Sequence, residues 1–145
     1  MKVHNYEFPE DLYYHKEDHL WVKAIEKNKV RIGIDDFAAK ESGRIDFVDL
    51  PRIGEEFSKG DVIVTIESGK WVGRLRSPVS GKVLYVNERL YDDPSLINRS
   101  PYDEGWLLVI EAYDVERDIG DLIAGTQTDK IKDWIEREIK ERLGR

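Results

Sequence analysis

The fold is decided by residues 59–88, which read KGDVIVTIESGKWVGRLRSPVSGKVLYVNE. Short apolar runs alternate here with turn-forming residues, since Gly, Pro, Ser and Asp favour the backbone conformations of tight turns. The turn signals are Lys59-Gly60-Asp61, Ser68-Gly69, Ser77-Pro78 and Ser80-Gly81. Signals this closely spaced favour a small sandwich or barrel over a helical bundle. The segment therefore predicts a mainly β fold.

Two parts of this segment resemble each other. Residues 59–67 and residues 80–88 each place a glycine before a polar residue, continue through apolar residues and end in an acid. Alternating apolar runs of this length are typical of strands. We interpret the pair as a weak internal repeat of two strands about a hairpin, with Gly69 and Lys70 near its tip.

The residues before this segment predict three more strands. Residues 21–25 and 29–34 are rich in β-branched and apolar side chains, and the polar residues 26–28 between them are suited to a turn. Residues 44–50 form a third β-like run, which Pro51 stops because proline cannot donate to a sheet ladder. These strands extend the β fold toward the N-terminus.

A short helix is expected between the second and third of these strands. Asp35 or Asp36 is suited to its start, because a carboxylate oxygen accepts hydrogen bonds from the free amides there. The helix would run through residues 37–40 and end at Gly43, since glycine readily adopts the left-handed conformation that closes many helices.

The chain changes character after residues 106–110, another β-like run. Apolar residues then recur at helical spacing in two groups, with Gly125 and either Thr126 or Thr128 as the separator and cap. The groups are Val115, Ile119, Leu122 and Ile123, then Ile131, Trp134, Ile135, Ile139 and Leu143. The pattern divides the chain into a domain over residues 1–125 and an amphipathic helix over 126–145, packed on the domain or flanking it. Packing on the β core is the preferred role of its apolar stripe, and docking of a partner is the alternative.

Composition excludes several classes of protein. A chain of 145 residues fits one domain. Its formal net charge of −7 argues against nucleic-acid binding, which needs clustered, unopposed Lys and Arg. No apolar run is long enough for a membrane span, and the N-terminus lacks the features of a signal or transit peptide. We therefore expect a cytoplasmic protein, without disulfides or thiol nucleophiles because it has no cysteine.

Lys70 is the main candidate site residue, because it carries a modifiable amine and lies at the predicted hairpin tip. A lysine at a tight turn presents its amine away from the core, and Gly69 would allow the turn because glycine tolerates positive φ. The protonated amine is a poor nucleophile, so this placement suits enzymatic acylation. The alternative is an ordinary solvated turn lysine.

The ordered set of motifs identifies a family. The segments are YHKEDHLW at 14–21, VRIGI at 30–34, FVDLP at 47–51, ESGK at 67–70, SPVSG at 77–81, and PSLINRSPYDEGWL at 94–107. In this order they resemble the H protein of the glycine cleavage system over most of the chain. No single segment is specific, but the series is.

The resemblance implies a barrel-sandwich hybrid fold, similar to lipoyl- and biotinyl-carrier domains, with short helices and C-terminal helices. It implies that Lys70 becomes N6-lipoyllysine and that the dithiolane is the reactive group. The chain would then be no enzyme but a carrier in glycine catabolism, shuttling an aminomethyl group from glycine decarboxylase to an aminomethyltransferase. Dihydrolipoyl dehydrogenase and a lipoate-attaching enzyme are its other implied partners, and a freely presented hairpin suits a monomer.

Residues beside the lysine are further candidates. Glu67, with Ser68 and Gly69, is expected to be recognised by the modifying enzyme, and a routine exposed carboxylate is the alternative for Glu67. His15 and His19 have the spacing of a helical metal pair, but no third ligand or helix is evident, so we expect no metal site. Trp21 and Trp106 are interpreted as core aromatics because of their large apolar area.

The lysine's neighbours depart from the family pattern E-S-V-K-A-x-x-D/E. Gly69 and Trp71 replace its valine and alanine, and Arg74 and Arg76 add positive charge. Trp71, Arg74 and Arg76 therefore define a candidate partner surface, because charge at an interface rim changes which partners dock. Drift within the family, with Trp71 covering apolar surface, is the alternative.

Three other functions stay open at this stage. The first is the H-protein-like lipoate-binding protein of heterodisulfide-reductase-like sulfur oxidation, whose arm would carry sulfur to a heterodisulfide-reductase-like complex. The second is an unmodified regulatory or interaction domain, which the amphipathic tail would suit. A biotin carrier is a weaker alternative, because Lys70 is not flanked by methionines.

Overall fold

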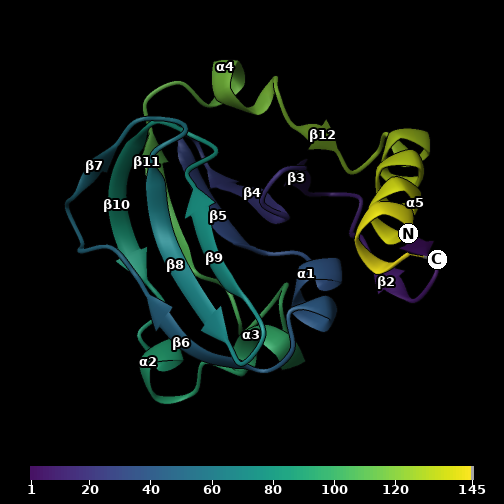
Figure 1. Ribbon diagram of the computed structural model, residues 1–145. Helices are drawn as coiled ribbons and strands as arrows, with labels where there is room; N and C mark the ends of the chain where they lie inside the picture. The colour runs from purple at the N-terminus through teal and green to yellow at the C-terminus, as the bar shows by residue number, and fades with distance from the viewer. Residues whose placement is uncertain (145) are drawn as a thin grey trace.

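The computed structural model describes residues 1–144 and consists of two packed sheets with helices around them (Figure 1). The larger sheet has seven antiparallel strands in the order β12-β3-β4-β5-β11-β10-β7. In chain order these are β3 (Tyr13–His15), β4 (Leu20–Glu26), β5 (Lys29–Ile34), β7 (Glu56–Phe57), β10 (Gly81–Val86), β11 (Leu108–Ala112) and β12 (Ile123–Ala124).

The smaller sheet has three antiparallel strands in the order β6-β8-β9. They are β6 (Ile45–Asp49), β8 (Val62–Ser68) and β9 (Val72–Arg76). A separate two-stranded ribbon, β1 (Lys2–Val3) with β2 (Tyr6–Glu7), precedes both sheets. The helices are α1 (Asp36–Glu41), α2 (Arg89–Asp92), α3 (Leu96–Arg99), α4 (Val115–Ile119) and α5 (Thr128–Leu143).

The main hydrophobic core lies between the two sheets. Val22 and Ile32 of the larger sheet and Ile66 and Leu75 of the smaller one are buried in the same cluster. These side chains come from the facing sides of the two sheets, so the two inner faces meet as a sandwich. This arrangement confirms the predicted mainly β, barrel-sandwich fold.

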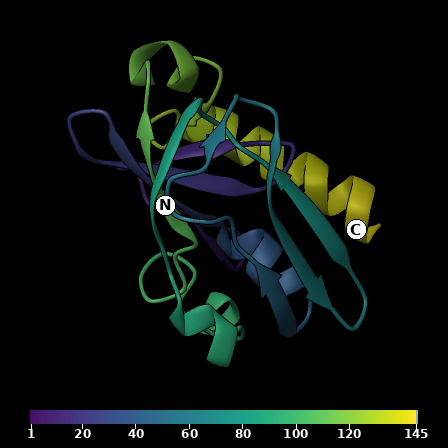
Figure 2. The same ribbon diagram turned by 90° about the vertical axis from the view of Figure 1, so that its left-hand side faces the viewer.

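A second core holds the C-terminal helix against the N-terminal segment. Ile131, Trp134 and Ile135 of α5 are buried together with Phe8 and Tyr14. The apolar stripe predicted from the sequence thus packs on this chain's own aromatic residues. Figure 2 shows α5 flanking the sheet sandwich without entering it.

The predicted start and end of α1 are confirmed. The Asp35 carboxylate accepts a hydrogen bond from the Ala38 amide at 2.9 Å, and Gly43, just beyond the helix, has a φ of +75°. The predicted position of Gly69 and Lys70 at the tip of a hairpin is also confirmed, because β8 and β9 pair and residues 69–71 join them. The internal repeat differs from the prediction, since β10 pairs with β11 and β7 in the other sheet and not with β8.

Two predictions for the C-terminal region were wrong. Helix α4 ends at Ile119, and Ile123 instead pairs with Tyr14 as part of the edge strand β12. This pairing gives backbone N–H and C=O groups of β12 hydrogen-bond partners in β3, and such partners are required for buried backbone groups. Neither threonine caps α5: Gln127 occupies the cap position without a side-chain hydrogen bond, and Thr128 is the first helical residue.

Candidate functional site

The β8–β9 hairpin positions Lys70 and is fixed to α1. The Ser68 amide donates to the Trp71 carbonyl at 2.8 Å, which closes the turn. The Ser68 hydroxyl donates to the Ser42 carbonyl at 2.6 Å, which ties the tip to the end of α1. Gly69 has open space around its Cα and no positive φ. The prediction that the turn needs a positive φ at Gly69 was therefore wrong.

The segment that receives the tip is itself anchored. The side-chain amide of Asn98 in α3 donates to the Ala39 carbonyl at 2.7 Å and to the Gly43 carbonyl at 2.9 Å. Its oxygen accepts from the Ile45 amide at 2.8 Å. Asn98 lies in the quoted PSLINRSPYDEGWL motif, but the sequence assigned it no role. It holds the turn after α1 on which the hairpin rests.

Lys70 is exposed at this tip. Its aliphatic stem lies over Gly43, where an added Cβ would sit 3.1 Å from Lys70 Cε. Among residues 1–144, no hydrogen bond or ion pair engages the Lys70 Nζ. Acylation of this amine would therefore displace no existing interaction, so the residues present fit a group attached there.

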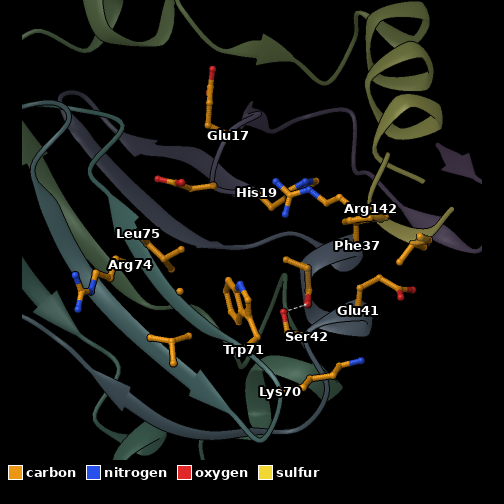
Figure 3. A pocket seen from close by; sticks show the side chains of 15 residues that line it. Glu17, His19, Phe37, Glu41, Ser42, Lys70, Trp71, Arg74, Leu75 and Arg142 are labelled. Atoms are coloured by element: carbon orange, nitrogen blue, oxygen red, sulfur yellow. Dashed lines mark hydrogen bonds between the residues drawn. The ribbon is translucent and has the colours of Figure 1, made fainter. Parts of the chain in front are cut away.

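A groove of about 490 Å³ begins beside Lys70 (Figure 3). One side is β9 with Trp71 just before it, and the other is α1. The lining residues come from four segments: 17–19, 37–42, 70–75 and 142–143. The groove thus joins the hairpin tip to the end of α5.

Trp71 covers part of the groove's β9 side. Its indole lies so close to Gly73 that an added Cβ there would sit 2.2 Å from the ring. Trp71 is half-buried and packs against the main core. The pairing of Trp71 with a glycine two residues later is therefore a steric requirement, and the indole covers apolar surface as well as bordering the groove.

The two predicted partner-surface arginines have different environments. Arg76 makes two side-chain hydrogen bonds to the Asp18 carboxylate, at 3.0 and 3.1 Å, so it joins β9 to the loop before β4. Burial raises the pKa of Asp18, but the bonds from Arg76 outweigh this and hold it below its usual value. Arg74 is exposed and has no charged partner within the described residues. It is the arginine available to a docking partner.

Glu67 lies in an exposed cross-strand row with two apolar residues. Phe47 of β6 and Val72 of β9 flank it in register, and they are 52% and 56% exposed. The two exposed apolar side chains thus lie on either side of the Glu67 carboxylate. The row lies next to the hairpin tip.

Comparison with known proteins identifies the family. The family model described as "Glycine cleavage H-protein" matches residues 12–134. The chain is 52% identical over 106 residues to a protein of Coprothermobacter proteolyticus named "Glycine cleavage system H protein", covering 73% of this chain and 83% of that one. It is 48% identical over 125 residues to a Listeria monocytogenes serotype 4b protein of the same name, covering 86% and 98%.

A solved structure agrees. The crystal structure of a glycine cleavage system H protein from Mycobacterium marinum matches with a TM-score of 0.75 and 32% identity, covering 86% of this chain and 98% of that chain. The chain belongs to the glycine cleavage H-protein family. Members of this family are lipoyl carrier components and not catalysts, with lipoate attached covalently to a lysine. Within the described part of this family member, no helix is both long enough and apolar enough to cross a membrane.

The other predicted site residues of this H-protein family member lie apart from the tip. Trp21 is buried and donates to the Pro101 carbonyl at 2.9 Å, whereas Trp106 is half-buried beneath the Arg31 guanidinium, 5.2 Å from the ring centroid. His15 lies in β3 and His19 directly before β4, and among residues 1–144 no group of three or more His, Cys, Asp or Glu residues is arranged to hold a metal ion.

His19 is instead part of a buried ionic cluster that the sequence did not indicate. Its Nδ1 lies 2.8 Å from the Asp35 carboxylate and its Nε2 2.5 Å from the Glu138 carboxylate. Burial alone lowers the pKa of His19, but the charges and hydrogen bonds of the two carboxylates raise it to about 9. The imidazole is therefore protonated at neutral pH and donates to both acids. Its partner Glu138 is 119 residues away, so no local pattern could reveal the cluster.

Proposed function

We propose that the chain carries its lipoyl group on Lys70 and shuttles an aminomethyl group from glycine decarboxylase to an aminomethyltransferase. The observation that carries the proposal is the exposed amine of Lys70, unpaired within residues 1–144, at a hairpin tip that Ser68 fixes beside the groove. Dihydrolipoyl dehydrogenase would then restore the oxidised carrier. We expect the chain to act as a monomer, which sedimentation velocity can check.

The chain's own contribution is positional. The lipoyl group supplies a disulfide that opens to accept the cargo, and the protein needs no thiol of its own, having no cysteine. The Ser68–Ser42 hydrogen bond fixes where the tether begins, and Gly43 leaves room for the Lys70 stem. A tethered group meets each partner's site at a high effective concentration.

Glu67, Ser68 and Gly69 are proposed as the recognition segment for the lipoate-attaching enzyme. Glu67 is exposed within the apolar row beside the tip, so a basic residue of the enzyme could pair with it while the row is covered. Trp71, Arg74 and Arg76 are proposed as the partner surface. Because Arg76 is already paired with Asp18, Arg74 carries the larger part of that role.

The first test is a loading experiment. The chain is lipoylated with a lipoate-attaching enzyme, incubated with glycine decarboxylase and glycine, and the mass of the Lys70 peptide is measured. An aminomethyl mass gain is expected, while the Lys70→Arg variant should acquire neither lipoyl nor aminomethyl mass. A standard H protein run in parallel is the positive control for the decarboxylase.

Sulfur carriage is the second candidate, and Arg74 favours it. This exposed arginine stands at the fourth position after Lys70, where the family pattern has an acid, and it lines the groove. A cation there suits anionic cargo better than an amine, because like charges repel. A lipoylated chain that gains no aminomethyl mass while the standard protein loads would favour a partner of the heterodisulfide-reductase-like type. A chain that is never lipoylated would favour the unmodified interaction domain.

A further inference from the structure

The end of helix α5 forms one wall of the groove beside Lys70. Arg142 and Leu143 line the groove together with α1 and β9. Figure 3 shows Arg142 and Lys70 on the same groove, with α1 between them and Trp71 facing them from the turn before β9. Helix α5 belongs to neither sheet, so the sandwich by itself does not fix this wall.

A chain of ionic contacts connects α5 to α1. It runs by hydrogen bonds from Asp35 through His19 to Glu138, and Glu138 also forms an ion pair with Arg142, whose Nε lies 3.2 Å from the carboxylate. Asp35 is the residue that caps α1, and Arg142 is a residue of the groove wall. The chain of contacts thus begins at the cap of α1, which forms one side of the groove, and ends at the wall formed by α5.

The His19 ring also fills the space between the two helices. It stacks on Phe37 of α1 and on Trp134 of α5, with ring centroids 4.8 Å apart in each case and interplanar angles of 22° and 23°. His19 is 3% exposed, and its φ of +56° is uncommon for a residue with a side chain. A strained backbone of this kind persists where the surroundings over-determine it.

We propose that His19 is a positioning residue of the carrier site: it fixes α5 against α1, and Arg142 and Leu143 thereby close the groove next to Lys70. The part of this inference that concerns carriage rests on the proposed function, since a closed groove shelters an arm only if Lys70 bears one. The closure of the groove by α5 does not depend on a lipoyl arm, because the contacts that hold α5 in place are made by side chains of the protein.

The groove can be probed without lipoylation. The chain has no cysteine, so Ser42→Cys supplies a unique thiol at a groove-lining position that is 7% exposed. Its rate of reaction with 5,5′-dithiobis(2-nitrobenzoate) reports how open the groove is. The rate is measured in the apoprotein alone and in four further backgrounds: Glu138→Gln, the double variant Arg142→Ala with Leu143→Ala, Arg142→Lys, and Glu141→Gln. Glu141→Gln is the matched control, since Glu141 is exposed on α5 and does not line the groove.

The expected result is a graded opening. The Glu138→Gln background should react about fivefold faster or more, because local opening of α5 exposes the thiol. The double variant should react faster as well, although its His19 contacts are intact, and Arg142→Lys should restore part of the slow rate. Glu141→Gln should leave the rate unchanged. Equal rates in all backgrounds would overturn the proposal, and so would faster reaction in Glu138→Gln alone, which would make His19 a stabilising residue unrelated to the wall.

A second measurement separates this inference from the proposed function. The dihydrolipoyl thiols of the lipoylated, reduced chain are alkylated with N-ethylmaleimide in the same backgrounds, without Ser42→Cys. Faster alkylation in Glu138→Gln and in the double variant supports a wall that shelters the arm. Unchanged alkylation, with faster labelling of the thiol introduced by Ser42→Cys, would overturn its part in carriage. If wild type cannot be lipoylated at Lys70, the proposed function fails, and labelling of the introduced thiol still decides whether the wall exists.

Discussion

Lys70 and His19 border the same groove, but they are opposite kinds of residue. Lys70 is exposed, unpaired within residues 1–144, and defined by its immediate neighbours in the sequence. His19 is buried, bonded through both ring nitrogens, and defined by partners far along the chain. The comparison teaches that a modification site at a turn can be recognised from the residues next to it in the sequence, whereas the shape of the groove around it depends on contacts between residues far apart in the sequence. Substitutions at the two residues should therefore separate modification from stability.

The largest expected effect is at Lys70 itself. Lys70→Arg should abolish lipoylation completely, because a guanidinium cannot be acylated by the same chemistry. Stability should change by less than about 0.5 kcal/mol, as for most surface substitutions away from special features. Intact mass after incubation with the attaching enzyme, and chemical denaturation, measure the two quantities. Lipoyl mass on another lysine of the variant would contradict the assignment.

His19→Ala should have the reverse effect. It leaves Asp35 and Glu138 as buried carboxylates without their cation, which typically costs about 3–5 kcal/mol. Urea denaturation monitored by circular dichroism measures the loss. Lipoylation of Lys70 in the variant that is still folded should proceed, since within residues 1–144 the tip residues 69–71 make no hydrogen bond or ion pair to His19, Asp35 or Glu138. A loss of unfolding free energy of less than about 1 kcal/mol would contradict the prediction, because two buried carboxylates without their cation should cost more.

The pH dependence of stability tests the role of the His19 charge without creating the cavity that His19→Ala would leave. The pKa of His19 is raised from 6.5 to about 9 in the folded chain, so the protonated form stabilises folding. That stabilisation is fully present below pH 6.5, decreases above it, and is lost as the pH rises through about 9, with a total of about 3 kcal/mol. Denaturation between pH 6 and pH 10 should show this fall in wild type and a flatter profile in His19→Gln. Parallel profiles would mean that the imidazole does not titrate as described.

Gly73→Ala tests the Trp71 side of the groove. The new Cβ would lie 2.2 Å from the indole, so the ring must move, and overpacking of this kind costs about 1–3 kcal/mol. Tryptophan fluorescence should shift as Trp71 leaves the surface of β9. The Gly69→Ala variant is the matched control, because nothing lies within 4 Å of its added Cβ. An equal loss in both variants would point to backbone flexibility and not to the indole contact.

The two arginines of the partner surface provide the smallest expected effect. Arg76→Ala should cost about 1 kcal/mol, since it removes the two side-chain hydrogen bonds to Asp18 and leaves only the one from the backbone amide of residue 76. Arg74→Ala should be nearly neutral in thermal unfolding but should change the salt dependence of partner binding. The reverse order of stability losses would show that Arg74 has a structural partner in solution.

The sequence predicted the features that depend on neighbouring residues. Asp35 as the cap of α1, Gly43 beyond its end, and the tip at Lys70 all follow from turn and cap chemistry within a few positions. The strands of the sandwich followed from runs of apolar residues. These elements were enough to place the candidate site on a hairpin of a mainly β fold.

The failures have identifiable physical causes. Ile123 sits at helical spacing, but its backbone pairs with Tyr14, and tertiary pairing overrides local periodicity. Gly69 was assigned a positive φ because glycine permits one, yet the turn closes without it. Asn98 and Glu138 act on segments more than 50 residues away. Polar contacts across such separations leave no local pattern.

The hydrogen bond between Ser68 and Ser42 has a consequence for the geometry of delivery. It joins the hairpin tip to the turn that Asn98 holds, so the point from which the side chain of Lys70 departs belongs to the rigid body of the protein. The end of a lipoyl arm attached to Lys70 can therefore reach only positions within one arm's length of this fixed point. A partner enzyme has to bring its catalytic cavity within that distance when it docks, and the orientation of docking decides which cavities are reached.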